Sequence, residues 1–151
     1  MKVAVIGIGY WGKKHVEEYD QLGHDVVICD NDEKNISECK EKFPFAIVKT
    51  FEQLLGDTEI EAISICTPNE THFRIAKKCM ESNKHVFLEK PIATNLEDAD
   101  SLKKISENKK LVLQIGHLYR FNNSIKKAKE ILSNNSFGDV HSVYFSWTNY
   151  E

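Results

Sequence analysis

Three glycines near the amino terminus have the spacing of a loop that binds phosphate. Gly7, Gly9 and Gly12 fit the pattern G-x-G-x-x-G between an apolar stretch and a helical pattern, and Tyr10 and Trp11 lie within the same loop. Glycines at these positions allow a tight turn, a close approach of a pyrophosphate to the backbone and close packing of the helix. The N-terminus of that helix would stabilise the negative charge of the phosphates.

A carboxylate follows at the distance that a dinucleotide requires. Asp30 ends the second apolar stretch, about twenty residues after the loop, where it can accept hydrogen bonds from both hydroxyls of a ribose. Asp30 could instead cap the next helix, although Asn31 or Asp32 could serve as that cap. The sequence therefore predicts a dinucleotide site that includes Asp30 and Asn31.

Charge near this loop favours NAD over NADP. The 2′-phosphate of NADP would be repelled by Asp30 and Asp32, and the only arginines, Arg74 and Arg120, are far along the chain. We expect NAD as the cofactor, with NADP as the less favoured alternative, and we predict no metal site.

Two further groups of polar residues follow predicted strands. Thr67, Pro68 and Asn69 come directly after the fourth strand, with His72 one turn into the next helix, and Asn69 also suits a helix N-cap. Ligands bind at the carboxyl edge of open α/β sheets, which is the edge these residues would occupy.

Glu89, Lys90 and Pro91 follow the fifth predicted strand at the same edge. The ammonium group of Lys90 would point toward the nicotinamide end of the cofactor crevice. The alternative for Lys90 is an ordinary exposed lysine.

Apolar stretches that suit buried parallel strands alternate with helical patterns along the chain. The predicted strands are 2–6, 25–30, 46–48, 62–66, 85–88 and 111–116, and the longer predicted helices are 10–22, 32–43, 70–82 and 96–108. Thr50 with Gln53, and Thr94 with Glu97, have the spacing of capping boxes. The pattern predicts the α/β class, with the doubly wound parallel sheet of a Rossmann fold.

The end of the chain has a different pattern. Residues 124–133 suggest a helix, and residues 141–147 alternate like a strand with no partner downstream. We expect a dinucleotide-binding domain over 1–120, and over 121–151 a linking helix and the first strand of an α/β substrate domain that the sequence lacks.

Composition narrows the class of protein. The 151 residues are 41% hydrophobic, enough for one compact domain, and the net charge of −3 gives no basis for binding nucleic acid or an anionic membrane. No apolar run approaches the roughly 18 to 20 residues that span a bilayer, and the start does not resemble a signal peptide. The four cysteines lack C-x-x-C spacing, so we expect reduced thiols and a cytoplasmic protein.

Most histidines have no arranged partner in the sequence. His15, His24, His85 and His141 are expected to have surface or packing roles, which leaves only His72 and His117 as candidates for the site.

The motifs together resemble one family. Gly-Ile-Gly-Tyr-Trp-Gly (7–12), Thr-Pro-Asn-Glu-Thr-His (67–72) and Glu-Lys-Pro (89–91), in this order, are similar to the glucose–fructose oxidoreductase/inositol dehydrogenase family, Gfo/Idh/MocA. Residues 116–121 resemble the family's segment after the sixth strand, so the likeness covers residues 1 to about 147.

The resemblance implies a role for each matched residue. Lys90 would be catalytic by holding and polarising the substrate hydroxyl, Thr67, Pro68, Asn69 and His72 would border the cofactor, and Glu89 and Arg120 would lie near the nicotinamide. A cation beside a hydroxyl stabilises developing alkoxide while a base removes the proton and the cofactor accepts hydride.

It also implies an oxidoreductase that transfers hydride between NAD and the hydroxyl of a sugar, cyclitol or sugar nucleotide, as a homo-oligomer when intact. Family members carry the histidine general base in a second domain that this sequence does not match, so we expect the chain alone to turn over poorly. The alternative is a non-catalytic dinucleotide-binding or sensor module, against which the retained Lys90 argues. A methyltransferase-like Rossmann domain would not account for Glu-Lys-Pro.

Overall fold

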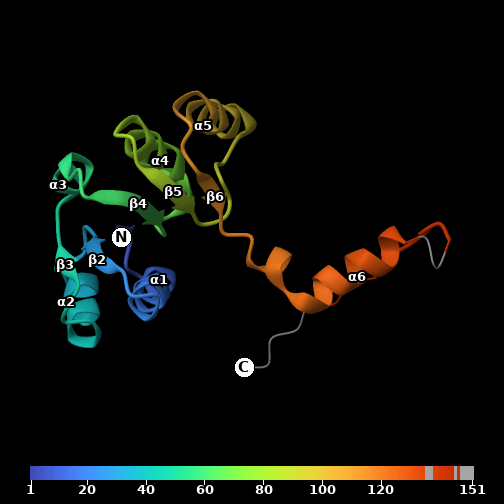
Figure 1. Cartoon of the computed structure of the whole chain (residues 1–151), viewed down its shortest axis with the longest axis horizontal. Coiled ribbons are helices and arrows are strands. Elements are labelled where there is room, and N and C mark those ends of the chain that lie inside the picture. The colour runs from blue at the N-terminus through green and yellow to red at the C-terminus, as the bar shows by residue number, and fades with distance from the viewer. Residues whose placement is uncertain (135–137, 145, 147–151) are drawn as a thin grey trace. The chain divides into compact units, whose positions relative to one another are not determined.

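The computed structural model describes residues 1–134, 138–144 and 146, and it divides the chain into two compact units (Figure 1). The first unit is Met1–Gly116 and the second is His117–Glu151. Among the described residues, no helix is long and apolar enough to cross a membrane.

The first unit contains one sheet in which every paired neighbour is parallel. Its six strands are β1 (Lys2–Ile6), β2 (Asp25–Cys29), β3 (Ile47–Val48), β4 (Ile60–Ile65), β5 (His85–Leu88) and β6 (Leu113–Ile115). Their order across the sheet is β3-β2-β1-β4-β5-β6. This order confirms the predicted doubly wound fold. From β1 the chain first adds strands on one side of the sheet (β2, β3) and then on the other (β4, β5, β6), so the switch point lies between β1 and β4. Such sheets open a crevice for ligands at this point.

Helices connect these strands and cover both faces of the sheet. They are α1 (Tyr10–Gln21), α2 (Glu33–Lys42), α3 (Phe51–Gly56), the 3₁₀ turn η1 (Asn69–Thr71), α4 (His72–Glu81) and α5 (Leu96–Lys109). Alternate residues of β1 belong to different apolar clusters, because successive side chains of a strand point to opposite faces. Val3 and Val5 pack with α1 and α2, whereas Ala4 and Ile6 pack with α3, α4 and α5.

The register places the ends of the inner strands level with one another. Ile6 pairs with Cys29 and Ile65, Ile65 pairs with Leu88, and Leu88 pairs with Ile115. The loops that carry the predicted site residues therefore leave the sheet side by side at its carboxyl edge.

One of the two predicted capping boxes forms. Thr50 and Gln53 make both reciprocal hydrogen bonds at the start of α3, as predicted. The box predicted for Thr94 is wrong, because Asn95 caps α5 by accepting a hydrogen bond from the Asp98 amide at 2.8 Å. Asparagine is as good an N-cap as threonine or better, and the helix begins at Leu96, where the pattern predicted it.

The second unit contains η2 (Leu118–Phe121) and α6 (Asn123–Ser133), close to the predicted helix. The strand predicted over 141–147 does not form in described residues 141–144 and 146, and residues 145 and 147 lie outside the described residues. A strand needs a neighbour to complete its hydrogen bonds, and alternation in the sequence does not supply one.

The first unit also contains a cluster of charges centred on Asp57. Its Oδ2 atom accepts hydrogen bonds from Lys49 Nζ at 2.6 Å and Lys2 Nζ at 2.9 Å, and Oδ1 accepts from the Glu59 amide at 3.0 Å. These bonds, led by the one from Lys49, hold the pKa of Asp57 well below its usual value.

Acid should therefore destabilise the fold partly through Asp57. A carboxylate whose pKa is lowered by folding stabilises the native state fully above its ordinary pKa of 3.8, and that contribution disappears as the pH falls below this value. We expect Asp57→Asn to lower the free energy of unfolding at pH 7 and to reduce its fall between pH 5 and pH 2, measured by urea unfolding. Asp25→Asn, at an exposed position, is the control. An unchanged acid dependence in Asp57→Asn would rule out this role.

Candidate functional site

The loop between β1 and α1 can form only with glycine at two of its positions. Gly7 has φ +81°, a conformation that other residues rarely adopt, and its amide donates to the Cys29 carbonyl at 2.9 Å. A Cβ atom on Gly12 would lie 2.0 Å from the Gly7 carbonyl oxygen, whereas one on Gly9 would meet nothing within 4 Å. Gly12 thus serves the fold of the loop, and Gly9 leaves space above it.

Helix α1 begins at this loop without a side chain to cap it. Its N-cap residue is Gly9, no side chain bonds to its first amides, and its first turn contains no acidic residue. By contrast, side chains of Asp32, Thr50 and Asn95 cap the starts of α2, α3 and α5. The first amides of α1 are therefore available to an anion.

Asp30 joins the end of β2 to this loop. Its Oδ2 atom accepts a hydrogen bond from the Ile8 amide at 2.7 Å and faces Asn35 Nδ2 at 3.4 Å, while Oδ1 accepts from the Asp32 amide at 2.9 Å. Asp32 itself caps α2 by accepting a hydrogen bond from the Lys34 amide. Asp32 was one of the two residues predicted to serve as this cap in place of Asp30. Asp30 is consequently free of the capping role and holds the glycine loop from the neighbouring strand.

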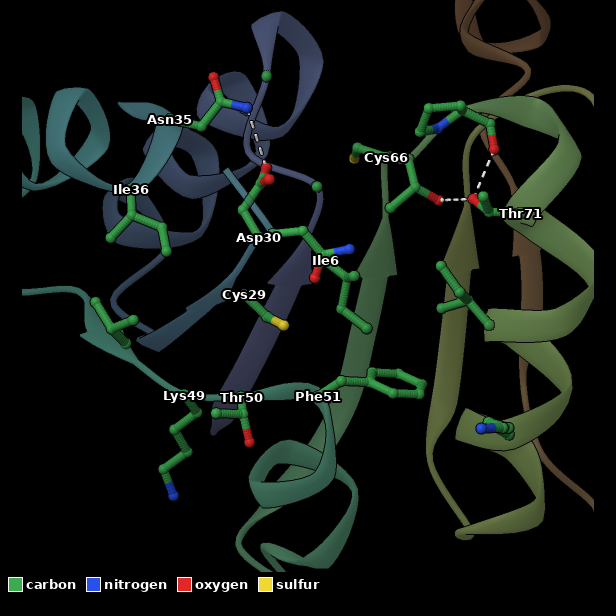
Figure 2. A pocket seen from close by; sticks show the side chains of 18 of the residues that line it. Ile6, Cys29, Asp30, Asn35, Ile36, Lys49, Thr50, Phe51, Cys66 and Thr71 are labelled. Carbon is green, nitrogen blue, oxygen red and sulfur yellow. Dashed lines mark hydrogen bonds between the residues drawn. The ribbon is translucent and has the colours of Figure 1, made fainter. Parts of the chain in front are cut away.

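A cavity of about 960 Å³ opens beside Asp30 (Figure 2). Of the predicted site residues, it is lined by Gly7, Gly9, Asp30, Asn31, Thr67 and Pro68. Figure 2 shows Asp30 and Asn35 on one side of this space and Thr71 on the other, with Phe51 from α3 between them. The structure thus brings together the residues after β1, β2 and β4.

Part of the cavity wall comes from residues that were not among the predicted site residues. One face of the η1–α4 segment supplies Thr71, Arg74, Ile75 and Lys78, and the connection from β3 to α3 supplies residues 48–52. The spacing of 71, 74, 75 and 78 places side chains on one face of a helix, so the periodicity alone could have indicated this wall.

The position of Arg74 corrects one step of the cofactor argument. Arg74 lines the same cavity as Asp30, so its distance along the chain did not exclude it from the site. Lys49 and Lys78 also line this cavity, and Lys49 is paired with Asp57. The case for NAD therefore depends on the carboxylate of Asp30 at the end of β2 and not on a lack of cations.

The remaining predicted residues lie outside the lining of this cavity, among them Tyr10, Trp11 and Asn69. Tyr10 and Trp11 are exposed on the first turn of α1, with their rings in an edge-to-face contact 5.4 Å apart. Asn69 is exposed in η1, where Pro68 and not Asn69 precedes the turn.

His72 is completely buried and joins two loops of the site. Its Nδ1 atom lies 2.7 Å from the Pro91 carbonyl oxygen, and its Nε2 atom lies 2.9 Å from the Thr67 carbonyl oxygen. Carbonyl oxygens only accept, so a neutral imidazole can donate one of these bonds and the imidazolium can donate both. His72 does not line the cavity, and its contacts fix the loop after β4 to the loop after β5.

Glu89 and Lys90 differ in exposure although they are adjacent. The Glu89 side chain is buried and its Oε2 atom accepts from the Lys90 amide at 3.3 Å, whereas Lys90 is exposed at the carboxyl edge. A Cβ atom on Gly116 would lie 2.8 Å from Glu89 Oε1, so this carboxylate occupies the space beside a glycine.

His15 has partners, contrary to the prediction. Its Nε2 atom lies 3.3 Å from Glu89 Oε1 and its Nδ1 atom lies 3.3 Å from the Ser64 hydroxyl. The sequence signal for this role is that His15 follows Gly12 by three residues and so lies one turn into the helix that the loop places on the sheet.

Arg120 and His117 belong to the second unit, where the Arg120 amide donates to the His117 carbonyl.

The cysteines are not nucleophiles at this site. All four are free, as predicted, and Cys29 and Cys66 line the cavity. Burial raises the pKa of Cys29 to about 11 and that of Cys66 to about 12, so both remain thiols at neutral pH. Among the described residues, no group of three or more His, Cys, Asp or Glu could hold a metal ion.

The strand order, the glycine loop and the carboxylate after β2 define a dinucleotide-binding Rossmann domain. Residues 1–117 match the family model described as "Oxidoreductase family, NAD-binding Rossmann fold". The chain belongs to this family, Gfo/Idh/MocA, as the three motifs indicated.

Curated and structural relatives agree with this assignment. Myo-inositol 2-dehydrogenase of Thermotoga maritima is 33% identical over 148 residues, which are 93% of this chain and 43% of that protein. The structure of UDP-N-acetylglucosamine 3-dehydrogenase from Acidithiobacillus ferrooxidans is 30% identical, with a TM-score of 0.78 over 86% of this chain and 42% of the other.

A third relative shows the fold at lower identity. Scyllo-inositol dehydrogenase from Lactobacillus casei, solved with bound NAD(H) and scyllo-inositol, has 22% identity and a TM-score of 0.82 over 92% of this chain and 42% of that one. This chain therefore spans less than half the length of the relatives it matches.

Proposed function

We propose that this chain provides the NAD-binding part of a dehydrogenase that transfers hydride between NAD and the hydroxyl of a sugar, cyclitol or sugar nucleotide. Two relatives at 30% identity or more are named for the oxidation of such compounds, myo-inositol and UDP-N-acetylglucosamine. The observation that carries the proposal is the Asp30 carboxylate in a cavity that also exposes Gly7 and Gly9.

The residues of this cavity fit a dinucleotide. Asp30 would accept hydrogen bonds from the ribose hydroxyls, and the uncapped amides of α1 beside Gly9 would bind the pyrophosphate. Thr67 and Pro68, on the adjacent β4 loop, would border the cofactor where it crosses the switch point. NAD, when bound, would supply the carbon that accepts or donates hydride.

Lys90 is the proposed catalytic residue. It is exposed at the end of β5, beside the loop after β4, and its backbone is held by Glu89 and by the contact from His72 to Pro91. Its ammonium would stabilise negative charge that develops on the substrate oxygen as hydride leaves. Tyr10, Trp11, Asn31, Asn69, His72, Glu89 and Arg120 complete the proposed cofactor contacts, directly or through the loops.

We further propose that residues 1–120 form the cofactor domain and that 121–151 connect it to a substrate domain in an intact, homo-oligomeric enzyme. Four free thiols are the state expected in a reducing compartment, which supports a cytoplasmic location.

The cofactor part of this proposal can be tested by calorimetric titration of the chain with NAD and with NADP. We expect NAD to bind more tightly than NADP. Asp30→Ala should weaken NAD about tenfold to a hundredfold, because hydrogen bonds to a charged group contribute roughly 1.5–3 kcal/mol each.

Asp25→Ala provides the control, since Asp25 begins the strand that Asp30 follows and is exposed at its opposite end. It should bind NAD as the unmodified chain does. Equal affinity of the Asp30→Ala variant and the unmodified chain would refute the proposed role of Asp30, and a chain that binds neither nucleotide would refute the cofactor assignment.

A further inference from the structure

A chain of buried polar side chains connects helix α1 to the β5 loop. Tyr19 Oη lies 2.6 Å from Ser64 Oγ, Ser64 Oγ lies 3.3 Å from His15 Nδ1, and His15 Nε2 lies 3.3 Å from Glu89 Oε1. Ser64 has no exposed surface, and the side chains of His15 and Glu89 are 15% and 10% exposed. Polar groups this deep in a domain are costly unless each has its partners, and these do.

The acceptor at one end fixes the direction of every bond in this chain. With a carboxylate oxygen as acceptor, His15 donates from Nε2 to Glu89. Burial lowers the pKa of His15 against the opposing effect of Glu89, so the imidazole is neutral at pH 7 and its Nδ1 atom must accept. Ser64 therefore donates to His15 and accepts from Tyr19.

The same carboxylate determines the path of the backbone at Lys90. Glu89 Oε1 accepts the hydrogen bond from His15 Nε2, and Glu89 Oε2 accepts one from the Lys90 amide at 3.3 Å. The His15 ring also contacts the Phe87 ring edge-to-face, with centroids 5.2 Å apart, so it is fixed against the strand that leads into this loop. The absence of a side chain on Gly116 leaves the space that this carboxylate occupies.

We propose that His15 is a positioning residue for the proposed catalytic lysine, acting through Glu89. It holds the buried carboxylate in the one rotamer that receives the Lys90 amide, and so sets where the Lys90 side chain leaves the sheet. The inference rests on the proposed function, because it assigns the β5 loop to the nicotinamide half of the site. The effect is confined to that half, since the adenosine half is bound at the β2 end near Asp30.

Two substitutions separate this role from general packing. The amide nitrogen of glutamine can replace Nε2 of histidine as a donor to Glu89, whereas the shorter asparagine cannot reach it. We expect His15→Asn to weaken NAD about five- to tenfold, less than the loss of a direct hydrogen bond from a charged group to the cofactor, because His15 acts through Glu89. His15→Gln should restore most of this affinity, and ADP-ribose, which lacks nicotinamide, should bind both variants as it binds the unmodified chain.

The matched control is His24→Asn, the same substitution three residues after the end of α1. It should leave the affinity for both nucleotides unchanged. Unaltered NAD affinity in His15→Asn would overturn the proposal, and so would an equal loss of NAD and ADP-ribose, which indicates general damage to the fold.

Nitrogen-15 NMR of the imidazole tests the contact without any nucleotide. The proposal requires a single protonated ring nitrogen, Nε2, at pH 7, and a Lys90 amide resonance that shifts in His15→Asn and returns in His15→Gln. A proton on Nδ1, or an unshifted Lys90 amide, would refute it. If the unmodified chain binds neither nucleotide, the proposed function fails, and these resonances alone decide the role of His15.

Discussion

Alanine in place of Gly12 is expected to remove most of the stability of the first unit. Its Cβ atom would lie 2.0 Å from the Gly7 carbonyl oxygen. Cβ is fixed to the backbone of α1 and the oxygen belongs to the loop that follows β1, so the clash can be relieved only by a shift of the backbone. Overpacking a fixed site costs typically 1–3 kcal/mol and more where the backbone must shift, so we expect a loss of about 3 kcal/mol or more. Urea unfolding followed by circular dichroism would measure it.

Gly9→Ala is the matched control for this experiment. A Cβ atom on Gly9 would meet nothing within 4 Å, so the unfolding midpoint should stay close to that of the unmodified chain. The same methyl group would occupy the space through which a pyrophosphate approaches the loop, so NAD binding should be lost. The pair thus separates a glycine that the fold requires from one that the cofactor requires. A stable Gly12→Ala, or a Gly9→Ala that binds NAD normally, would contradict this division.

Replacement of His72 by leucine is expected to have the second largest effect. Leucine fills a similar volume but cannot donate, so the completely buried side chain at this position loses its contacts with the carbonyl oxygens of Thr67 and Pro91. A neutral imidazole donates one of these bonds and an unsatisfied polar group costs about 1–3 kcal/mol, so we expect a loss of about that size in the free energy of unfolding.

His72→Gln and His72→Asn should each retain part of this stability, because each side chain keeps one amide donor. His24→Leu, in the turn between α1 and β2, should change the free energy of unfolding by less than about 0.5 kcal/mol, as substitutions away from such features usually do. Urea midpoints measured together would show this order. A midpoint for His72→Leu equal to that of His24→Leu would show that the two carbonyl contacts contribute nothing.

Much of this fold could be predicted because its signals are local. Apolar strands, glycine turns and helical periodicity identified all six strands of the sheet within two residues at each end. The glycine loop and Asp30 were found for the same reason, since their chemistry depends on fixed spacing within one βαβ unit. The terminal strand does not form in described residues 141–144 and 146, because alternation is also local, whereas a strand needs a partner.

What the sequence did not reveal depends on contacts between distant residues. His15 and Glu89 are 74 residues apart and meet only because α1 lies over β4 and β5. Arg74 was discounted by its position in the chain, although α4 places it on the cavity of Asp30. The burial of His72 was also hidden, because the Thr-Pro-Asn-Glu-Thr-His motif identifies a loop but does not show which side chain turns inward.

The cavity beside Asp30 is built only from residues between Ile6 and Lys78, whereas Glu89 and Lys90 follow it in the chain. Under the proposed function, recognition of the nucleotide and the chemistry on the substrate would thus be encoded in successive stretches of the sequence. A lineage could change its preference between related cofactors by substitutions near residues 31–36 without disturbing the lysine loop. The parallel sheet brings the two stretches together at one edge, while substitutions can accumulate in each stretch separately.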